Sequence, residues 1–277
     1  MGLGMDRCVR KILDGLAKQE EEIVMSPSEG EAKSYFRQRS LLAYFLPQLA
    51  WEDVLAFQQR LVFDVSEEPR QKGALILGEH SPIVTVGRQG SHQHLRHEEM
   101  EIATGQVAVK WTNRGGGCWH QQPGQLVAYP ILPLSPDSFG LAQYRDSLYR
   151  TIVEVLREFE IDAVADRRTA SVTVGGRPIA SVGIAVKQWV SYHGCVINVG
   201  IPLDRRPLVS GGGDDRQGGT CMFRELRTPV RVGTVREAFL RHFVGIFGFG
   251  HYYLSSPPAS LIRPQRGIHA SVSPSYY

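Results

Sequence analysis

The sequence lacks most features that mark a membrane, secreted or nucleic-acid-binding protein. No stretch approaches the roughly 20 apolar residues that a membrane-spanning helix needs. The amino-terminal segment has no continuous apolar run of the kind found in signal peptides, and its acidic run at 20–22 is untypical of a transit peptide. The formal net charge is only +3, and lysine and arginine form no cluster. We therefore expect neither a membrane nor a nucleic-acid partner.

Cysteine is scarce and scattered along the chain. The four cysteines form no CxxC pair, and such spacing in 277 residues is weak evidence for disulfide bonds. We therefore expect a reduced, cytoplasmic protein. Three histidines, His92, His94 and His97, lie close together, but no acidic or cysteine ligand set converges with them in the sequence. We expect no metal and no cofactor.

What is present is the composition of an ordinary globular protein, 42% hydrophobic and 21% charged. A chain of this length can bury one sizeable core. Residues 1–38 are polar and are interpreted as an extension, and the tail at 255–277 is rich in proline and serine. We predict one domain over 39–254 between them.

Hydrophobic periodicity in this domain alternates between helix and strand. Apolar residues at helical spacing predict helices over 51–65 and 141–159, and Thr234 with Glu237 has the pattern of a capping box at the start of a third. Gly175-Gly176 between two β-rich runs is typical of a hairpin. The predicted fold class is α/β (α+β), a mixed sheet with packed helices. The strands are expected at 73–87, 126–132, 169–187 and 190–200, all in one sheet.

Two segments near the predicted strands carry candidate binding residues. The strand at 83–87 is followed by Arg88, whose guanidinium could bind a phosphate or carboxylate, although a surface arginine after a turn is the simpler interpretation. Three consecutive glycines at 115–117 let the backbone approach a ligand closely, or form only a flexible loop.

A third segment combines small residues with a histidine. Ala180, Ser181 and Gly183 within a strand are expected to leave space on one face, which suits a ligand tunnel. His193 lies on the next strand, where a structural role is more common than a catalytic one. None of the three segments is specific by itself.

Together, these segments resemble the lipoyl(octanoyl) transferase family. The motifs EH-x-P-I-x-T-x-GR, RGG followed by PGQL-x-x-YPIL, IAS-x-GI-x-V and YHG-x-x-x-NV occur in the family order over roughly residues 40–248. The resemblance implies a biotin/lipoate protein ligase-like catalytic domain with a hydrophobic tunnel. It also implies transfer of a medium-length acyl group, octanoyl, from acyl carrier protein to a lysine of a lipoyl domain in lipoate biosynthesis. The substrate-binding residues that it implies are Arg88, Arg114, Gly115, Gly116, Gly117, His120, Gln121, Ser181, Gly183, His193, Gly194 and Asn198.

The family's catalytic dyad, a cysteine nucleophile and an activating lysine, is not matched. Pro178 stands where the family has the lysine, and Gly212 stands where it has the cysteine. Cys221 occupies a family serine position and is the candidate for a displaced nucleophile. In the glycine-rich segment Gln121 replaces a family histidine, although His120 is adjacent.

These departures leave three functions open. The first is an acyltransferase with altered chemistry, such as direct aminolysis of a thioester. The second is a catalytically inactive protein that binds the acyl chain or the lipoyl domain. The third, an ATP-dependent ligase of the same fold, is least favoured because that chemistry also relies on the missing lysine. Lys187 is expected to point elsewhere, and Cys118 and Cys195 are most simply structural residues.

Overall fold

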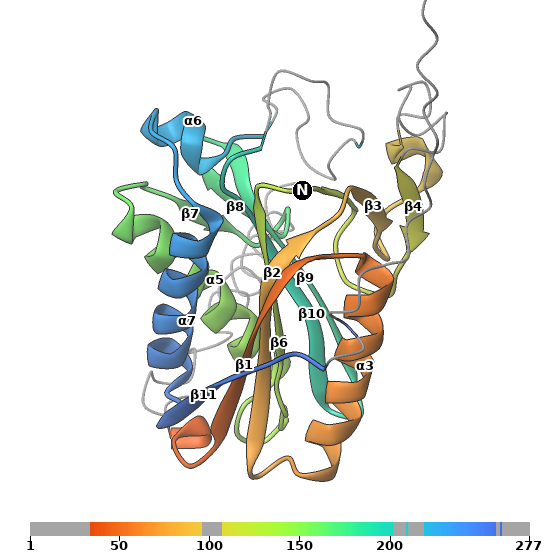
Figure 1. Cartoon of the computed structure of the whole chain (residues 1–277), viewed down its shortest axis with the longest axis vertical. Coiled ribbons are helices and arrows are strands. Elements are labelled where there is room, and N and C mark those ends of the chain that lie inside the picture. Colours follow the sequence, from red (N-terminus) through yellow and green to blue (C-terminus); the bar gives the residue numbers. More distant parts are fainter. Residues whose placement is uncertain (1–33, 96–106, 202–208, 210–218, 259–260, 262–277) are drawn as a thin grey trace, which may run out of the picture.

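An eight-stranded mixed sheet forms the centre of the computed structural model, which describes residues 34–95, 107–201, 209, 219–258 and 261 (Figure 1). The strand order is β11-β1-β2-β6-β10-β9-β8-β7. β1 is parallel to β2 and to β11, and every other neighbouring pair in this sheet is antiparallel. The strands are β1 (Ser40–Leu49), β2 (Lys72–His80), β6 (Gln125–Ile131), β7 (Val164–Asp166), β8 (Ser171–Val174), β9 (Arg177–Lys187), β10 (Val190–Asn198) and β11 (His251–Ser255).

A second, three-stranded sheet lies beside the large one. Its order is β4-β3-β5, and its strands are β4 (Ala108–Trp111), β3 (Ile83–Val86) and β5 (Cys118–Gln121). The expectation that 73–87 contributes to one sheet is therefore wrong, because β2 belongs to the large sheet and β3 to the small one. Ser81-Pro82 separates the two strands, and a proline has no N–H with which to continue the ladder of β2.

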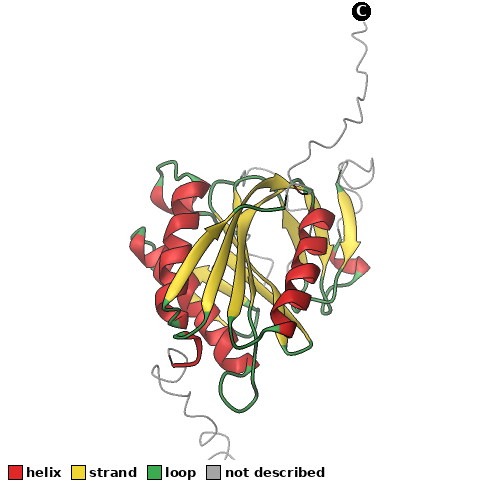
Figure 2. Cartoon of the chain, turned by 60° about the horizontal axis from the view of Figure 1, so that its bottom comes forward, coloured by secondary structure: helices red, strands yellow, loops and turns green. Residues whose placement is uncertain are grey.

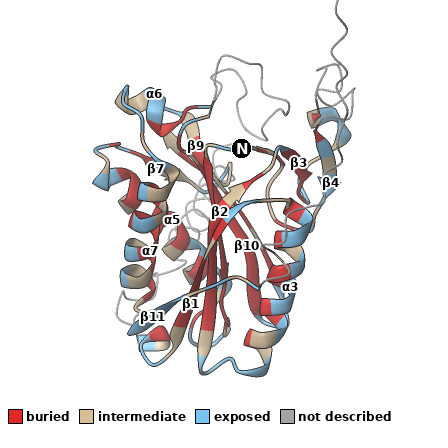
Figure 3. Cartoon of the chain, viewed as in Figure 1, coloured by how far each residue is buried: buried red, intermediate tan, exposed pale blue. Residues whose placement is uncertain are grey.

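Helices cover both faces of the large sheet (Figure 2). Helix α3 (Trp51–Glu67) packs on one face, and α5 (Leu141–Glu158) and α7 (Val232–Phe247) pack on the other. Successive side chains of a strand point to opposite faces. Accordingly, Cys195 and Ile197 of β10 join the core under α5 and α7, whereas Val196 joins the core under α3. Figure 3 shows buried residues along the central strands and the inner sides of these helices.

Most predicted elements are confirmed. The helices predicted at 51–65 and 141–159 are α3 and α5, and the predicted strands at 126–132 and 190–200 are β6 and β10. Gly175 and Gly176, with φ of 54° and 80°, connect β8 to β9 as the hairpin signal predicts.

The predicted capping box at Thr234 and Glu237 is wrong. Helix α7 starts at Val232 with Arg231 as its N-cap, and no side chain caps it. The Thr234 N–H already donates to the Arg231 carbonyl, so Thr234 lies inside the first turn. A short helix, α6 (Met222–Leu226), precedes α7.

The predicted extensions at 1–38 and 255–277 lie almost wholly outside the described residues, so the domain boundaries stay predictions. β1 begins at Ser40, and the last strand, β11, ends at Ser255. Within the part of the chain that the structure describes, no helix is long and apolar enough to cross a membrane.

Candidate active site

The glycine loop, residues 112–117, lies against a free stretch of β9. β8 pairs with β9 only between Arg177 and Ser181, so Ile184 lies beyond the end of β8. The Gly115 N–H donates to the Ile184 carbonyl at 2.9 Å, which holds the loop on this edge. A Cβ on Gly115 would lie 4.0 Å from a guanidinium nitrogen of Arg88, so Arg88 borders the loop as its position after β3 predicts.

Glycine is required where the loop meets the end of β3. The Gly87 N–H donates to the Gly117 carbonyl at 3.0 Å, and a Cβ on Gly87 would lie only 2.4 Å from the carbonyl oxygen of Gly116. Gly116 also has a φ of 82°, in the left-handed region that favours glycine. Close backbone approach therefore explains these glycines without a ligand.

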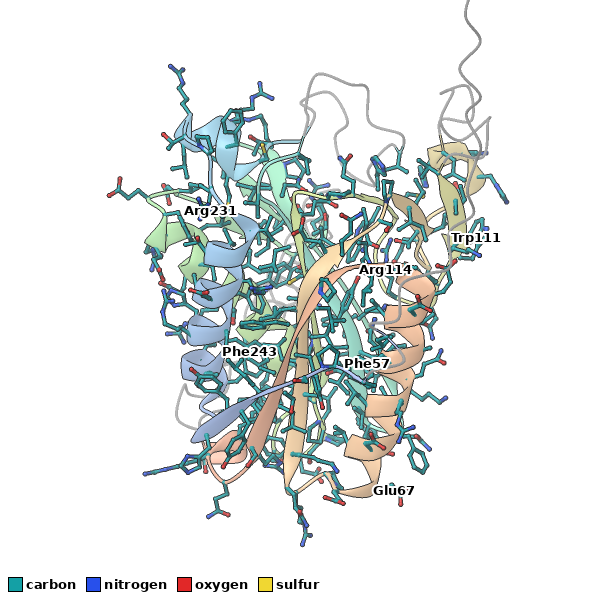
Figure 4. The ribbon with its side chains drawn as sticks, viewed as in Figure 1. Phe57, Glu67, Trp111, Arg114, Arg231 and Phe243 are labelled. Atoms are coloured by element: carbon teal, nitrogen blue, oxygen red, sulfur yellow. The ribbon has the colours of Figure 1, made fainter. Side chains whose placement is uncertain are left out.

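Arg114 is buried inside the loop, with an exposed fraction of 2% (Figure 4). Its guanidinium donates to the Thr85 carbonyl and hydroxyl, both at 2.9 Å, and to the Gly115 carbonyl at 3.0 Å. Its Cζ lies 3.6 Å from the ring centroid of Trp119, a cation–π contact. Burial lowers the pKa of Arg114 to about 9, and no carboxylate contributes to that shift. Arg114 thus adds a buried positive charge to this region.

Trp119 fills the space that the small residues of β9 were expected to leave for a ligand. A Cβ on Gly183 would lie 2.8 Å from two atoms of the indole, Cζ2 and Cη2, and 2.6 Å from the Gly115 carbonyl oxygen. Ser181 is half-buried. Ala180 belongs to the core under α5 and α7, so it does not share a face with Ser181 and Gly183, as had been expected. The space over Gly183 is occupied, and the tunnel stays a prediction.

His193 is held against the glycine loop by an unusual backbone conformation. Its φ is 56°, which is rare for a residue with a side chain, and its N–H donates to the Gln58 Oε1 at 2.8 Å. Its ring Nε2 lies 3.1 Å from the Thr112 hydroxyl and 3.4 Å from the Asn113 Oδ1. The glycine loop therefore lies within hydrogen-bonding distance of the His193 ring. Burial and the charge of Arg114 lower the pKa of His193 to about 3, so the imidazole is neutral at physiological pH.

The residue after His193 is Gly194, where the backbone of β6 leaves no room for a side chain. A Cβ at this position would lie 2.2 Å from the Ala128 carbonyl oxygen and 2.7 Å from the Pro130 ring. A packing requirement is therefore sufficient to explain the glycine of this His-Gly pair.

A buried hydrogen-bond chain links Gln121 to the large sheet. The Nδ1 of His80 lies 3.2 Å from the Leu49 carbonyl, so this nitrogen carries the proton and Nε2 accepts from the Tyr129 hydroxyl at 2.9 Å. The Tyr129 oxygen in turn accepts from the Gln121 Nε2 at 3.3 Å. Burial lowers the pKa of His80 to about 4 and keeps it neutral. The Gln121 Oε1 is left buried without a partner among the described residues.

Asn198 is connected through Gln125 to the end of β5 that is farther along the chain from the glycine loop. Its Oδ1 accepts from the Gln125 Nε2 at 2.9 Å, and its Nδ2 donates to the Thr220 carbonyl at 3.0 Å. Gln125 also donates to the His120 carbonyl at 3.2 Å. Asn198 therefore connects β6 and β10 to the segment before α6, and its contacts do not include the three glycines at 115–117.

The position of the family lysine lies close to Cys221, but no amine is there. The Pro178 carbonyl accepts the Thr220 N–H at 2.8 Å. Next to Pro178, Arg177 forms an ion pair with Glu225 of α6, at 2.9 Å. Lys187 is exposed at the far end of β9, as predicted. The other lysines of the described residues, Lys72 and Lys110, form ion pairs with Glu68 and Glu52.

The described cysteines are all free and buried. Cys221 is fully buried, and its thiol donates to the Ile201 carbonyl at 3.8 Å. Cys118 donates to the Ser91 carbonyl at 3.9 Å, and burial raises its pKa. Cys195 is a core residue, as predicted, and burial raises its pKa as well. Gly212 lies outside the described residues.

Across the described ranges, no group of three or more His, Cys, Asp or Glu side chains could hold a metal ion.

Sequence reasoning missed two central residues of this region, Gln58 and Trp119. Gln58 had a detectable signal, because it lies at helical spacing between the apolar residues Val54 and Leu61 and is therefore a polar residue on the buried face of α3. Trp119 had no detectable signal in the sequence, because its position over Gly183 depends on the packing of the two sheets.

Comparison with known proteins connects this geometry to one family. Residues 51–244 match the family model of the lipoyl protein ligase A/B catalytic domain. An octanoyltransferase of Myxococcus xanthus is 31% identical over 215 residues, which is 75% of this chain and 60% of that protein. An octanoyltransferase of Desulfovibrio desulfuricans is 31% identical over 211 residues, which is 75% of this chain and 87% of that protein.

Solved structures agree on the fold. A lipoate-protein ligase A bound with ATP has a TM-score of 0.61 and 15% identity, covering 81% of this chain and 91% of that one. A bipartite lipoate protein ligase of Thermoplasma acidophilum has a TM-score of 0.60 and 15% identity, covering 82% of this chain and 89% of that one. At this level of identity the likeness shows the fold alone.

Proposed function

The chain belongs to the lipoyl protein ligase A/B catalytic domain family, and on that premise we propose that it transfers an octanoyl or related acyl group in lipoate biosynthesis. The observation that carries this proposal is the 31% identity to an octanoyltransferase over 87% of that relative's length. The contact between the glycine loop and His193 supports it, because this contact joins two of the motifs that resemble the transferase family.

The proposed donor is acyl carrier protein, and the proposed acceptor is a lysine of a lipoyl domain. Octanoyltransferases are the relatives that support this pair, together with the lipoate protein ligase of Thermoplasma acidophilum, whose structure was described with its E2 lipoyl domain. The acyl group is medium-length by the same reasoning. The proposed setting is cytoplasmic, since the described cysteines are free thiols, which a reducing compartment maintains.

The transfer proposed here is a direct aminolysis of the thioester. An acyl-enzyme requires a thiolate that meets the donor and a group that generates it. Cys221 and Cys118 are buried and their thiols donate to backbone carbonyls, while Pro178 has no amine. Holding the acceptor amine beside the thioester in a fixed geometry can itself provide a large part of the acceleration.

A second candidate function is binding without transfer, and the absence of an amine at Pro178 favours it. Such a protein would hold an acyl chain or a lipoyl domain, because burial of methylene groups needs no nucleophile. The experiment below separates it from the transferase.

The test is a transfer assay with octanoyl carrier protein and a lipoyl domain, followed by intact mass of all three proteins. Direct aminolysis predicts that the lipoyl domain gains one octanoyl group while no stable adduct appears on the chain. Cys221→Ser and Cys118→Ser should each retain transfer, and Cys195→Ser, which alters only a core residue, is the matched control for loss of stability. Loss of transfer in a folded Cys221→Ser variant would identify Cys221 as a relocated nucleophile. Acyl binding with no transfer by the wild-type protein would establish the second candidate.

A further inference from the structure

Gln58 of α3 presents a buried amide with one unused donor. Its side chain is fully buried, and its Oε1 accepts the backbone N–H of His193 at 2.8 Å. A backbone N–H can only donate, so this contact fixes the orientation of the amide and leaves Nε2 as the free end. Nε2 has no hydrogen-bond partner among the described residues. A buried donor without a partner is costly, which makes it a candidate for contact with a ligand.

His193 presents a matching acceptor. The Asn113 Nδ2 donates to the Tyr192 hydroxyl, which turns the Asn113 Oδ1 toward the Nε2 of His193. A carbonyl oxygen cannot donate, so Nε2 carries the imidazole proton and Nδ1 carries the lone pair. None of the described residues bonds to Nδ1. The Gln58 amide and the imidazole of His193, two residues joined through the His193 N–H, therefore offer one free donor and one free acceptor.

This pair matches the two polar groups that react in aminolysis. The carbonyl oxygen of the thioester gains negative charge in the transition state and needs a donor. The attacking amine carries N–H groups and needs an acceptor that orients it. Resting on the transfer proposed above, we propose that Gln58 Nε2 donates to the acyl carbonyl oxygen and that His193 Nδ1 accepts from the attacking lysine amine. In this step the C–N bond forms, the C–S bond breaks, and the proton that the amine loses ends on the departing thiolate.

The local charge favours an unprotonated amine. Arg114 is buried close enough to lower the pKa of His193, and no carboxylate among the described residues contributes to that shift. The same positive charge disfavours an incoming ammonium and so favours the neutral amine, which is the nucleophile. His193 then acts as a hydrogen-bond acceptor, because an imidazole with so low a pKa is a weak base.

The first experiment measures octanoyl transfer by Gln58→Met, with Gln59→Met as the matched control. Gln59 is the exposed neighbour on the same helix, so its variant should keep the wild-type rate. Gln58→Met should lower kcat by about a hundredfold or more, with KM for the acyl donor changed only a few-fold. If Gln58→Met does not fold, Gln58→Leu provides the same readout, because leucine also offers no hydrogen-bond donor. A folded variant with wild-type kcat overturns the proposal.

The second experiment separates the two ring nitrogens of His193. The amide oxygen of Asn can take the place of Nδ1, and Asn tolerates a positive φ, whereas the longer Gln places its amide near Nε2. His193→Asn should therefore keep kcat within about tenfold of wild type, while His193→Gln should lose about a hundredfold. Equal activity of the two variants, or the reverse order, would show that His193 only holds the glycine loop.

The third measurement needs no turnover. A peptide that carries N-octanoyl-lysine contains both an amide carbonyl and an amide N–H, so it can use the donor and the acceptor at once. Its affinity for Gln58→Met should be about tenfold lower than for the wild type and for Gln59→Met, which corresponds to the loss of one buried hydrogen bond. The wild-type protein could transfer no octanoyl group and still bind this peptide more tightly than Gln58→Met does. The proposed function would then be wrong, but the assignment of Gln58 Nε2 as a ligand-binding donor would be supported. Equal affinities overturn the assignment of Gln58.

Discussion

The rings of Tyr192 and His193 stack with their centroids 4.8 Å apart, although the two residues are neighbours in β10. In a regular strand, successive side chains point to opposite faces. By that rule His193 would join Cys195 and Ile197 under α5 and α7. Its positive φ turns the imidazole instead toward α3 and the glycine loop. Backbone strain of this kind persists only where the surroundings impose it, here through Gln58, and it is common at functional sites.

We expect His193→Gly to be more stable than His193→Ala, by about 1 kcal/mol, because a left-handed φ strains any residue that has a Cβ. Urea unfolding monitored by circular dichroism measures the difference. The same two substitutions at Val196, whose φ is negative, are the control and should show the opposite order, since glycine weakens a regular strand. If Ala is favoured at both positions, the conformation assigned to His193 is wrong.

Stability should fall as the pH is lowered from about 6.5 to about 3, because two histidines are buried in their neutral form. The folded-state pKa is about 4 for His80 and about 3 for His193, both below the ordinary histidine value of 6.5. The unfolded chain therefore binds more protons in this window, so the stability that is fully present above pH 6.5 is lost as the pH falls. The slope should approach about 1.4 kcal/mol per pH unit for each histidine.

Denaturant unfolding at a series of pH values measures this slope, and His193→Asn should reduce it by about half. His251 is exposed at the start of β11, so His251→Asn should leave the slope unchanged. An unchanged slope in His193→Asn would mean that His193 is not buried in a neutral form.

Gly183→Ala should destabilise the protein by about 1–3 kcal/mol, as overpacking of a core typically does. The added methyl would lie 2.6 Å from the Gly115 carbonyl oxygen and 2.8 Å from the Trp119 indole, and neither the backbone nor the packed ring can give way cheaply. Thermal unfolding measures the loss. Gly245→Ala is the control, because a Cβ there meets nothing within 4 Å and alanine favours the helix α7, so that variant should be slightly more stable.

Introducing a lysine at Pro178 and a cysteine at Gly212 should restore formation of an acyl-enzyme, if these are the positions of the family's catalytic lysine and cysteine. We expect Pro178→Lys combined with Gly212→Cys to gain one octanoyl group on incubation with octanoyl carrier protein, visible by intact mass and sensitive to hydroxylamine. Pro178 tolerates the change because its carbonyl, not its nitrogen, bonds to Thr220, and because it lies where the pairing of β8 and β9 is irregular. Neither single variant should form the adduct. A Gly212→Cys protein that acylates as readily without the lysine would mean that Pro178 does not mark the family position.

The sequence alone determined the helices α3 and α5, the hairpin at Gly175-Gly176 and the motifs that identify the family, because each depends on the spacing of a few neighbouring residues. It also determined that Pro178 offers no amine, since that follows from the residue type. The separation of β3 from β2 into different sheets was not predictable in this way, because strand pairing is a contact between distant segments. The same holds for Trp119 over Gly183 and for Gln58 against His193, residues that lie far apart in the chain. Only the folded chain decides which way the imidazole of His193 points, because a single backbone angle reverses the face that strand alternation predicts.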